Sequence, residues 1–204
     1  MSMVPAKLQQ FFVENPRVAL AFSGGCDSSY LLAAAIACGA QVKAYTVNTA
    51  FQAAFEIDDA RQVIHEVGGD FEIIEADILS QADICANPPD RCYRCKRFIF
   101  GTIAAHMVRD GYTVLIDGTN ATDDPANRPG FRALRELGVR SPLREADLSK
   151  DEIRRLSRAV KLFTGDKPSF SCLATKVKPN VLITGDVLRD VVKREGIKSW
   201  KSAN

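Results

Sequence analysis

The sequence lacks long apolar runs and contains very little histidine. No stretch reaches the ~18 consecutive apolar residues that a membrane-spanning helix needs. The N-terminal MSMVPAKLQQFF also lacks the basic segment followed by an apolar one that marks an export signal. We therefore expect a soluble, cytoplasmic protein without a membrane partner. The 204 residues include 2 histidines, His65 and His106, and show no internal repeat.

Cysteine is better represented, with 6 residues. The absence of an export signal argues against a disulfide framework, because cytosolic thiols are kept reduced, and such cysteines are more often buried, metal-bound or catalytic. Cys92 and Cys95 form a CxxC pair in NPPDRCYRCK. The pair alone fits a metal site, a redox pair or two buried thiols. A closed zinc site is disfavoured, because there is only one CxxC and the histidines have no ligand-like spacing.

The charge is distributed unevenly. Residues 1–139 contain 12 lysines and arginines against 17 acidic residues, whereas residues 140–204 contain 15 against 8. The basic C-terminal third favours anionic partners such as nucleotides, pyrophosphate or RNA, although a solvated helix surface explains it equally well.

Apolar extended runs alternate with helical stretches along most of the chain. The pattern predicts strands over residues 17–22, 41–47, 70–76 and 112–117, and helices over 27–39, 55–67, 91–110, 131–138, 149–160 and 184–195. Alternation of this kind predicts an α/β fold with a doubly wound parallel sheet. Residues 164–180 break the periodicity and are expected to form a loop. We expect a main domain over residues 1–145 and a short helical extension over 146–204, which carries Cys172.

The most informative short segment is ALAFSGGCDSS, in which a buried strand runs through two glycines into a helix. Glycines let the backbone turn sharply and approach a ligand, and the start of a helix offers unpaired N–H groups and the positive end of its dipole. Together these features predict a phosphate site. The loop has neither the lysine of a Walker loop nor the spacing of a dinucleotide-binding loop.

The segment SGGCDS resembles the signature of the PP-loop ATP pyrophosphatases, whose fold is adenine nucleotide alpha hydrolase-like. Members cleave ATP between its α and β phosphates, adenylate a substrate and release pyrophosphate. The resemblance implies that Ser23, Gly24, Gly25 and Ser28 wrap the pyrophosphate, while Asp27 helps to place Mg²⁺ and acts in catalysis. Cys26 occupies the variable position of the signature and is expected to fill space.

Two more segments favour a nucleotide, because ligands of doubly wound sheets bind beyond the carboxyl ends of the strands. TVN contributes Thr46, whose main chain could meet adenine, and DGTN contributes Gly118 and Thr119 beside the ribose or phosphates. Asp123 and Asp124 follow as candidate Mg²⁺ ligands, although acidic pairs in loops are more often simply solvated.

The segments NPPDRCYRCK, DGTNATDD, NRPGFRAL, ELGVRSPL, SKDEIRRLS and DKPSFSCLATK narrow the resemblance. In this order they are similar to the ATP-dependent sulfur transferases called LarE, from about residue 15 to about residue 185. The resemblance implies an enzyme that adenylates a carboxylate of a pyridinium nucleotide and inserts sulfur to give a thiocarboxylate, as in nickel-pincer nucleotide assembly. The logic is sound, because AMP is a good leaving group and a thiolate is a strong nucleophile.

The resemblance also concerns the source of the sulfur. In members with one relevant cysteine, the residue matching Cys172 gives up its own sulfur. In other members three cysteines hold a [4Fe-4S] cluster, and Cys92, Cys95 and Cys172 match that kind. Three thiolates leave one iron position free, as a catalytic cluster needs. Cys85 is a candidate fourth ligand that we expect to be incidental.

The sequence departs from the family in the run after CLA, where Lys176 stands in place of an arginine. Arg128, Arg140 and Lys176 are therefore candidate anion-binding residues, against the simpler interpretation of surface charges. A sulfide source and a homo-oligomer are further expected partners. Two alternatives remain, a tRNA-thiolating PP-loop enzyme and a non-catalytic nucleotide or metal sensor. A nucleic-acid partner is not expected, because no RNA-binding module is apparent.

Overall fold

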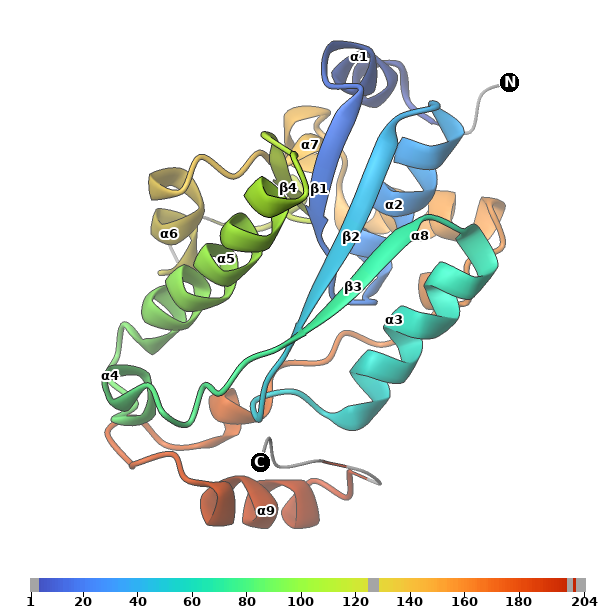
Figure 1. Ribbon diagram of the computed structural model, residues 1–204. Coiled ribbons are helices and arrows are strands. Elements are labelled where there is room, and N and C mark those ends of the chain that lie inside the picture. Colours follow the sequence, from blue (N-terminus) through green and yellow to red (C-terminus); the bar gives the residue numbers. More distant parts are fainter. Residues whose placement is uncertain (1–3, 125–128, 198–199, 201–204) are drawn as a thin grey trace.

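The structure, a computed structural model, describes residues 4–124, 129–197 and 200. Its centre is a parallel sheet of four strands in the order β3-β2-β1-β4 (Figure 1). The strands are β1 (Arg17–Ala21), β2 (Gln41–Asn48), β3 (Asp70–Glu75) and β4 (Leu115–Asp117). The predicted doubly wound α/β fold is confirmed. Because the strand order reverses between β1 and β4, a ligand is expected at the carboxyl ends of these two strands.

Helices cover both faces of the sheet. They are α1 (Ala6–Glu14), α2 (Cys26–Ala37), α3 (Ala54–Val67), α4 (Ala82–Cys85), α5 (Arg91–Arg109), α6 (Gly130–Glu136), α7 (Pro142–Glu145), α8 (Lys150–Ala159) and α9 (Gly185–Arg194), with short 3₁₀ turns η1 (Phe163–Gly165) and η2 (Leu173–Lys176). In Figure 1, α2, α3 and α8 lie on one side of the sheet, and α5 and α6 lie on the other. Among the described residues no helix is both long and apolar enough to span a membrane.

The alternation of side chains along a strand explains why the run RVALA is apolar throughout. Val18 and Leu20 are buried on the face covered by α2, in one apolar cluster with Leu31. Ala19 belongs to the cluster on the opposite face, together with Phe100 of α5. The central strand is therefore covered on both sides, as parallel sheets require.

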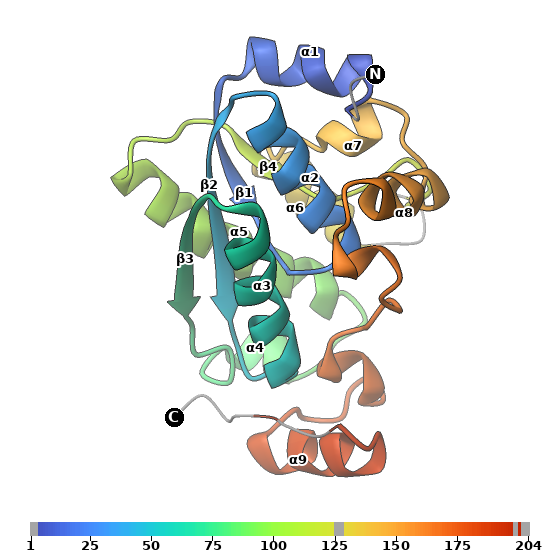
Figure 2. The same ribbon diagram turned by 90° about the vertical axis from the view of Figure 1, so that its right-hand side faces the viewer.

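The C-terminal segment forms a third apolar cluster. Leu173 of η2 and Leu188 of α9 pack with Ile84 of α4 and Phe51, which follows β2. Figure 2 shows α9 at the end of the molecule opposite α1. The helix α8, by contrast, packs against α2 in the main core. The division into domains at residue 146 stays a prediction.

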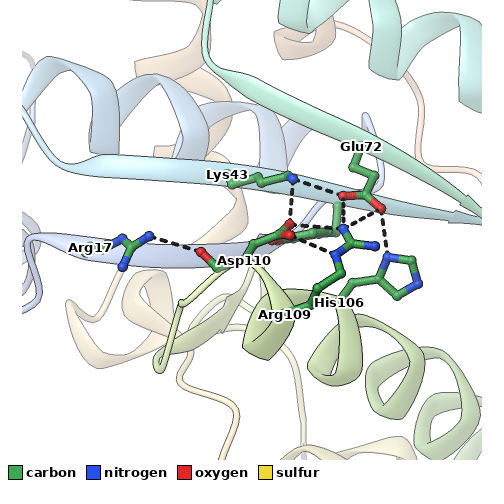
Figure 3. A network of polar contacts seen from close by, with 7 residues as sticks. Arg17, Lys43, Glu72, His106, Arg109 and Asp110 are labelled. Atoms are coloured by element: carbon green, nitrogen blue, oxygen red, sulfur yellow. Dashed lines mark hydrogen bonds and ion pairs between the residues drawn. The ribbon is translucent and has the colours of Figure 1, made fainter.

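Ion pairs fix the C-terminal end of α5 to the sheet (Figure 3). Lys43 of β2 contacts both Glu72 of β3, at 2.9 Å, and Asp110, at 2.6 Å. Arg109 bonds the same two carboxylates, and His106 contacts Glu72 at 2.7 Å. Five charged or titratable groups thereby join α5, β2 and β3.

The structure differs from the sequence-based expectations in several details, including two short helices, α4 and α7, that the sequence pattern does not predict. Helix α1 was not predicted, although Leu8, Phe11 and Phe12 bury one face of it. The strand expected from residue 112 begins at Leu115. The stretch 164–180 holds η2 and most of η1 rather than loop alone.

Candidate functional site

A cavity of about 980 Å³ lies at the carboxyl ends of β1 and β4. Its walls come from the loop after β1, the loop after β4, the first turns of α2, α3 and α8, the N-terminal half of α5 and the start of α6. Residues 167–172 line it as well. The cavity therefore occupies the place where a doubly wound sheet binds its ligands.

The SGGCDS loop lines the cavity and is held by its own serines. The hydroxyls of Ser23 and Ser28 lie 3.1 Å apart, and Ser28 Oγ donates to the carbonyl oxygen of Gly25 at 3.1 Å. Gly25 is the N-cap residue of α2. The helix therefore opens its N-terminus and the positive end of its dipole toward the cavity, as a phosphate site requires.

Two glycines allow this loop to lie where it does. Gly24 has φ of +69°, and a Cβ there would lie 2.7 Å from the backbone nitrogen of Ala60. A Cβ on Gly118 would lie 2.9 Å from the backbone nitrogen of Ser28. Glycine at these two positions therefore lets the loop after β1 approach α3 and the loop after β4 approach the start of α2.

Asp27 projects from the first turn of α2 between two partners from distant parts of the sequence. Its Oδ1 accepts a hydrogen bond of 2.6 Å from Lys150 Nζ, and its Oδ2 accepts one of 3.1 Å from Asn120 Nδ2. Both partners line the cavity. The carboxylate is thus oriented and faces a cation, which is the environment that a divalent metal ion would share or replace.

The loop after β4 is ordered by Asp117. Its Oδ2 accepts a hydrogen bond of 2.6 Å from Thr119 Oγ1, and its Oδ1 accepts one of 2.7 Å from Ser141 Oγ. Gly118 and Thr119 line the cavity, as does Asp123, whereas Thr46 and Asp124 are not among the lining residues. Thr46 is buried, and its hydroxyl donates to the carbonyl oxygen of Phe22 at 2.6 Å.

The three cysteines matched to the family gather at one end of the cavity. Cys92 and Cys172 line it, while Cys95 and Cys172 pack against the C-terminal apolar cluster. Burial raises the pKa of Cys95 to about 12, and the nearby thiols Cys172 and Cys92 add to the rise. Burial also raises the pKa of Cys172, against the Thr175 N–H and the charge of Arg91. The three thiols are electrostatic neighbours; Cys95 and Cys172 are partly buried, whereas Cys92 is exposed.

Arg91 contacts both the segment that carries Cys92 and the turn that follows Cys172. Its Nη1 donates to Asn87 Oδ1 at 2.5 Å and to the carbonyl oxygen of Ala174 at 2.8 Å, while its Nη2 lies 3.6 Å from Cys92 Sγ. The buried guanidinium therefore connects the start of α5 with η2, the turn that begins just after Cys172.

Comparison with known proteins identifies the family. Residues 9–121, more than half of the chain, match the family described as asparagine synthase, a PP-loop domain. An uncharacterized protein of Synechocystis sp. is 34% identical over 189 residues, which are 92% of this chain and 70% of that protein. The pyridinium-3,5-bisthiocarboxylic acid mononucleotide synthase of Lactiplantibacillus plantarum is 29% identical over 181 residues, 88% of this chain and 66% of the relative.

This chain belongs to the PP-loop ATP pyrophosphatases. It is accordingly an ATP-dependent enzyme. A solved structure of NMN synthetase from Francisella tularensis shares the fold of this PP-loop chain, with a TM-score of 0.59 at 15% identity, over 96% of this chain and 84% of the other.

The cations of this PP-loop cavity differ from those expected. Arg140 pairs with Glu145, and Lys176 pairs with Glu195 at 3.1 Å; neither lines the cavity. Arg128 lies outside the described residues. The lysines and arginines that line the cavity are Lys96, Lys150, Arg154 and Lys167. These residues come from α5, α8 and the segment after η1, which are distant in sequence, so only the tertiary fold brings them to the cavity.

Cys85 belongs to the apolar cluster against which Cys95 and Cys172 also pack. It is buried in the C-terminal cluster, and its thiol donates to the carbonyl oxygen of Ile78 at 3.3 Å. It does not line the cavity. That Cys85 is incidental stays a prediction.

Aromatic side chains that the sequence did not suggest form one wall of this PP-loop cavity. Phe55, at the start of α3, packs T-shaped against Phe170, with ring centroids 4.9 Å apart. Lys167 Nζ lies 4.8 Å from the centroid of Phe55 and pairs with Asp59. The wall combines aromatic rings with charge, and its residue Phe170 lies two positions before Cys172 in sequence.

Proposed function

We propose that this enzyme is an ATP-dependent sulfur transferase that adenylates a carboxylate of a pyridinium nucleotide and then exchanges one carboxylate oxygen for sulfur. The observation that carries the proposal is that a single cavity is lined by the SGGCDS loop and by Cys92 and Cys172. Activation by ATP and attack by sulfur occur at the same carbon, so the two kinds of group must lie together. The activity for which the L. plantarum relative is named supports a pyridinium nucleotide as the substrate.

In the first step a substrate carboxylate oxygen attacks the α-phosphorus of ATP, and pyrophosphate leaves. Ser23, Gly25 and Ser28 bind the departing phosphates with hydroxyl and N–H donors, helped by the dipole of α2. Asp27 would hold Mg²⁺, and Lys150 would offset the charge of the phosphates. In the second step a sulfur nucleophile attacks the activated carbonyl carbon, and the bond to AMP breaks.

We further propose that Cys92, Cys95 and Cys172 hold a [4Fe-4S] cluster. The chemistry of the donors fits, since Cys92 and Cys172 line one end of the cavity and Cys95 is their electrostatic neighbour beside it. Within residues 4–124, 129–197 and 200, no set of three or more Cys, His, Asp or Glu is arranged to hold a metal ion. Ligation would therefore require the thiols to deprotonate and turn toward one another. A cluster with one free iron position would supply exogenous sulfide as the nucleophile.

The decisive experiment uses anaerobically purified protein with its iron and sulfide quantified. It is incubated with ATP, Mg²⁺, sulfide and pyridinium-3,5-biscarboxylic acid mononucleotide. This nucleotide carries carboxylates where the product of the L. plantarum relative carries thiocarboxylates. Pyrophosphate release and the mass of an oxygen-to-sulfur exchange are then measured. Pyrophosphate without a thiocarboxylate would contradict sulfur transfer, and neither product would contradict the whole proposal.

The source of sulfur is resolved with cysteine variants. Cys92→Ala, Cys95→Ala and Cys172→Ala should each lose iron and thiocarboxylate formation, while Cys38→Ala, outside the cavity lining, should keep both. Normal turnover without iron, coupled to loss of sulfur mass from Cys172, would replace the cluster by sacrifice of that cysteine. The sulfide donor and a homo-oligomer stay predictions.

A further inference from the structure

We propose that Phe170 and Glu56 form the subsite that binds the positively charged pyridinium ring of the substrate. The inference rests on the proposed function and specifies where its substrate lies. Both residues line the cavity that also contains the SGGCDS loop. Phe170 precedes Cys172 by two positions, so a ring bound against it presents its carboxylate close to the sulfur site.

The aromatic half of this subsite has a free surface. Phe170 is 38% exposed, although it is a large apolar side chain in a cavity wall. Its neighbour Phe55 already carries a cation, because Lys167 Nζ lies 4.8 Å from the Phe55 centroid. The T-shaped packing at 77° holds Phe170 in a defined orientation. An aromatic surface that is fixed, accessible and rich in π electrons suits a flat cation.

The acidic half is a carboxylate with no ion-pair partner. Across the described parts of the chain Glu56 takes part in no ion pair, whereas two other carboxylates of the cavity do: Asp27 pairs with Lys150, and Asp59 pairs with Lys167.

Glu56 Oε2 accepts a hydrogen bond of 3.0 Å from the backbone N–H of Ala53. This bond fixes the Glu56 side chain at the start of α3. Burial raises the pKa of Glu56, and the Ala53 N–H and the charge of Lys167 offset the rise only in part. A cationic ring would supply the missing positive charge.

The two halves adjoin each other, because Phe55 connects them. It precedes Glu56 in α3 and packs against Phe170. A pyridinium ring on Phe170 therefore lies on the side of the cavity that carries the unpaired carboxylate. A neutral ring of the same shape would gain neither the cation–π attraction nor the ion pair.

The test uses calorimetry to compare binding of pyridinium-3,5-biscarboxylic acid mononucleotide, whose ring is positively charged (the charged form), with binding of its 1,4-dihydropyridine form, whose ring is neutral (the neutral form). The wild-type protein should prefer the charged form. Phe170→Ala and Glu56→Gln should each weaken binding of the charged form about 10-fold, with little effect on the neutral form and on the KM for ATP. The glutamine can still accept from Ala53 N–H, so it keeps the start of α3 while removing the charge.

Phe131→Ala is the matched control, because Phe131 does not line the cavity, and it should leave both affinities unchanged. Phe170→Trp adds a positive readout, since an indole stacked on a pyridinium ring gives a charge-transfer absorption band. This variant should retain binding and show the band only with the charged nucleotide.

The outcomes separate this inference from the proposed function. If the wild-type enzyme forms thiocarboxylate while Phe170→Ala and Glu56→Gln bind the charged nucleotide normally, the subsite is wrong and the function stands. If both variants lose binding but the wild-type protein makes no thiocarboxylate, the subsite stands and the function fails. If the wild-type protein binds neither form of the nucleotide, both are overturned.

Discussion

Lys150 Nζ donates a hydrogen bond of 2.6 Å to Asp27 Oδ1, which joins the first residue of α8 to the first turn of α2. The side chain of Ser149 accepts from the Glu152 N–H and begins α8 at this point, as the sequence predicts. The cap therefore does more than stabilise a helix, because it brings a lysine to the end of the cavity where the PP-loop opens.

Lys150→Met should reduce kcat/KM for pyrophosphate release about 10²-fold, because the variant removes a positive charge aimed at the phosphates. Asp27→Asn should cause a similar loss and raise the Mg²⁺ concentration needed for half-maximal activity. Steady-state kinetics at varied Mg²⁺ measure both effects. Lys193→Met, on the exposed side of α9, is the control for loss of a lysine. Normal kinetics of Lys150→Met would remove Lys150 from the ATP site.

Gly24→Ala should destabilise the protein by about 2–5 kcal/mol. It places a Cβ at a position with a left-handed backbone conformation, and that Cβ collides with the backbone of Ala60. Gly39→Ala provides the comparison, since Gly39 has φ of +76° but nothing within 4 Å of an added Cβ. Its cost should be about 1 kcal/mol. Denaturant unfolding measures both. Equal losses would show that the close approach of the SGGCDS loop to α3 carries no cost of its own.

Much of the fold is predictable because the local signals agree with the tertiary structure. The start of β4 is the instructive exception. Tyr112, expected in the strand, donates its N–H to the carbonyl oxygen of Met107, and Gly111 has φ of +75°. This is the ending of helix α5, which uses the backbone group that a strand would need. The first residues of the apolar run after Gly111 therefore end helix α5, and only the later ones form the strand.

The site is predictable only where its residues lie close together in the sequence. The segment SGGCDS and the cysteine motifs carry their own spacing, and their residues meet at the cavity, apart from Cys95, which packs beside it. Lys167 and Phe170 were assigned to an aperiodic loop. Their roles depend on contacts with Asp59 and Phe55 in α3, more than 100 positions away in sequence, which no local pattern reveals.

Arg91→Ala should destabilise the protein by about 3 kcal/mol, because it leaves Asn87 Oδ1 and the carbonyl oxygen of Ala174 without their buried donor. The loss should be concentrated in η2, since Arg91 connects that turn to α5. Hydrogen exchange at the amides of Leu173 and Val177 should accelerate more than exchange in the sheet.

Arg94→Ala is the matched control for Arg91. Arg94 sits one turn along α5, and its partners are Asp90 and Asp83 on the partly exposed surface. Its removal should change the free energy of unfolding by about 0.5 kcal/mol or less. If the two arginine variants have equal stability and equal exchange rates, Arg91 does not brace η2.

The network around Glu72 predicts how stability depends on pH. Burial alone would raise the pKa of Glu72, but hydrogen bonds from Lys43, Arg109 and His106 outweigh it and lower the pKa from 4.5 to about 2. A carboxyl with a lowered folded-state pKa contributes stability that is fully present above its unfolded pKa and is lost as the pH falls through the folded one. The free energy of unfolding should therefore decline between about pH 4.5 and about pH 2.

Glu72→Gln tests this dependence directly. The variant should be less stable than the wild type at pH 7 and should lose less stability on acidification, because its side chain does not titrate. Urea unfolding at pH 7, 4 and 3 supplies the comparison. Glu66→Gln is the control: Glu66 lies exposed on α3 and accepts only from Gln62 among the contacts of the described chain, so its curve should follow the wild type. Parallel pH curves for Glu72→Gln and the wild type would show that the network in Figure 3 does not set the acid stability.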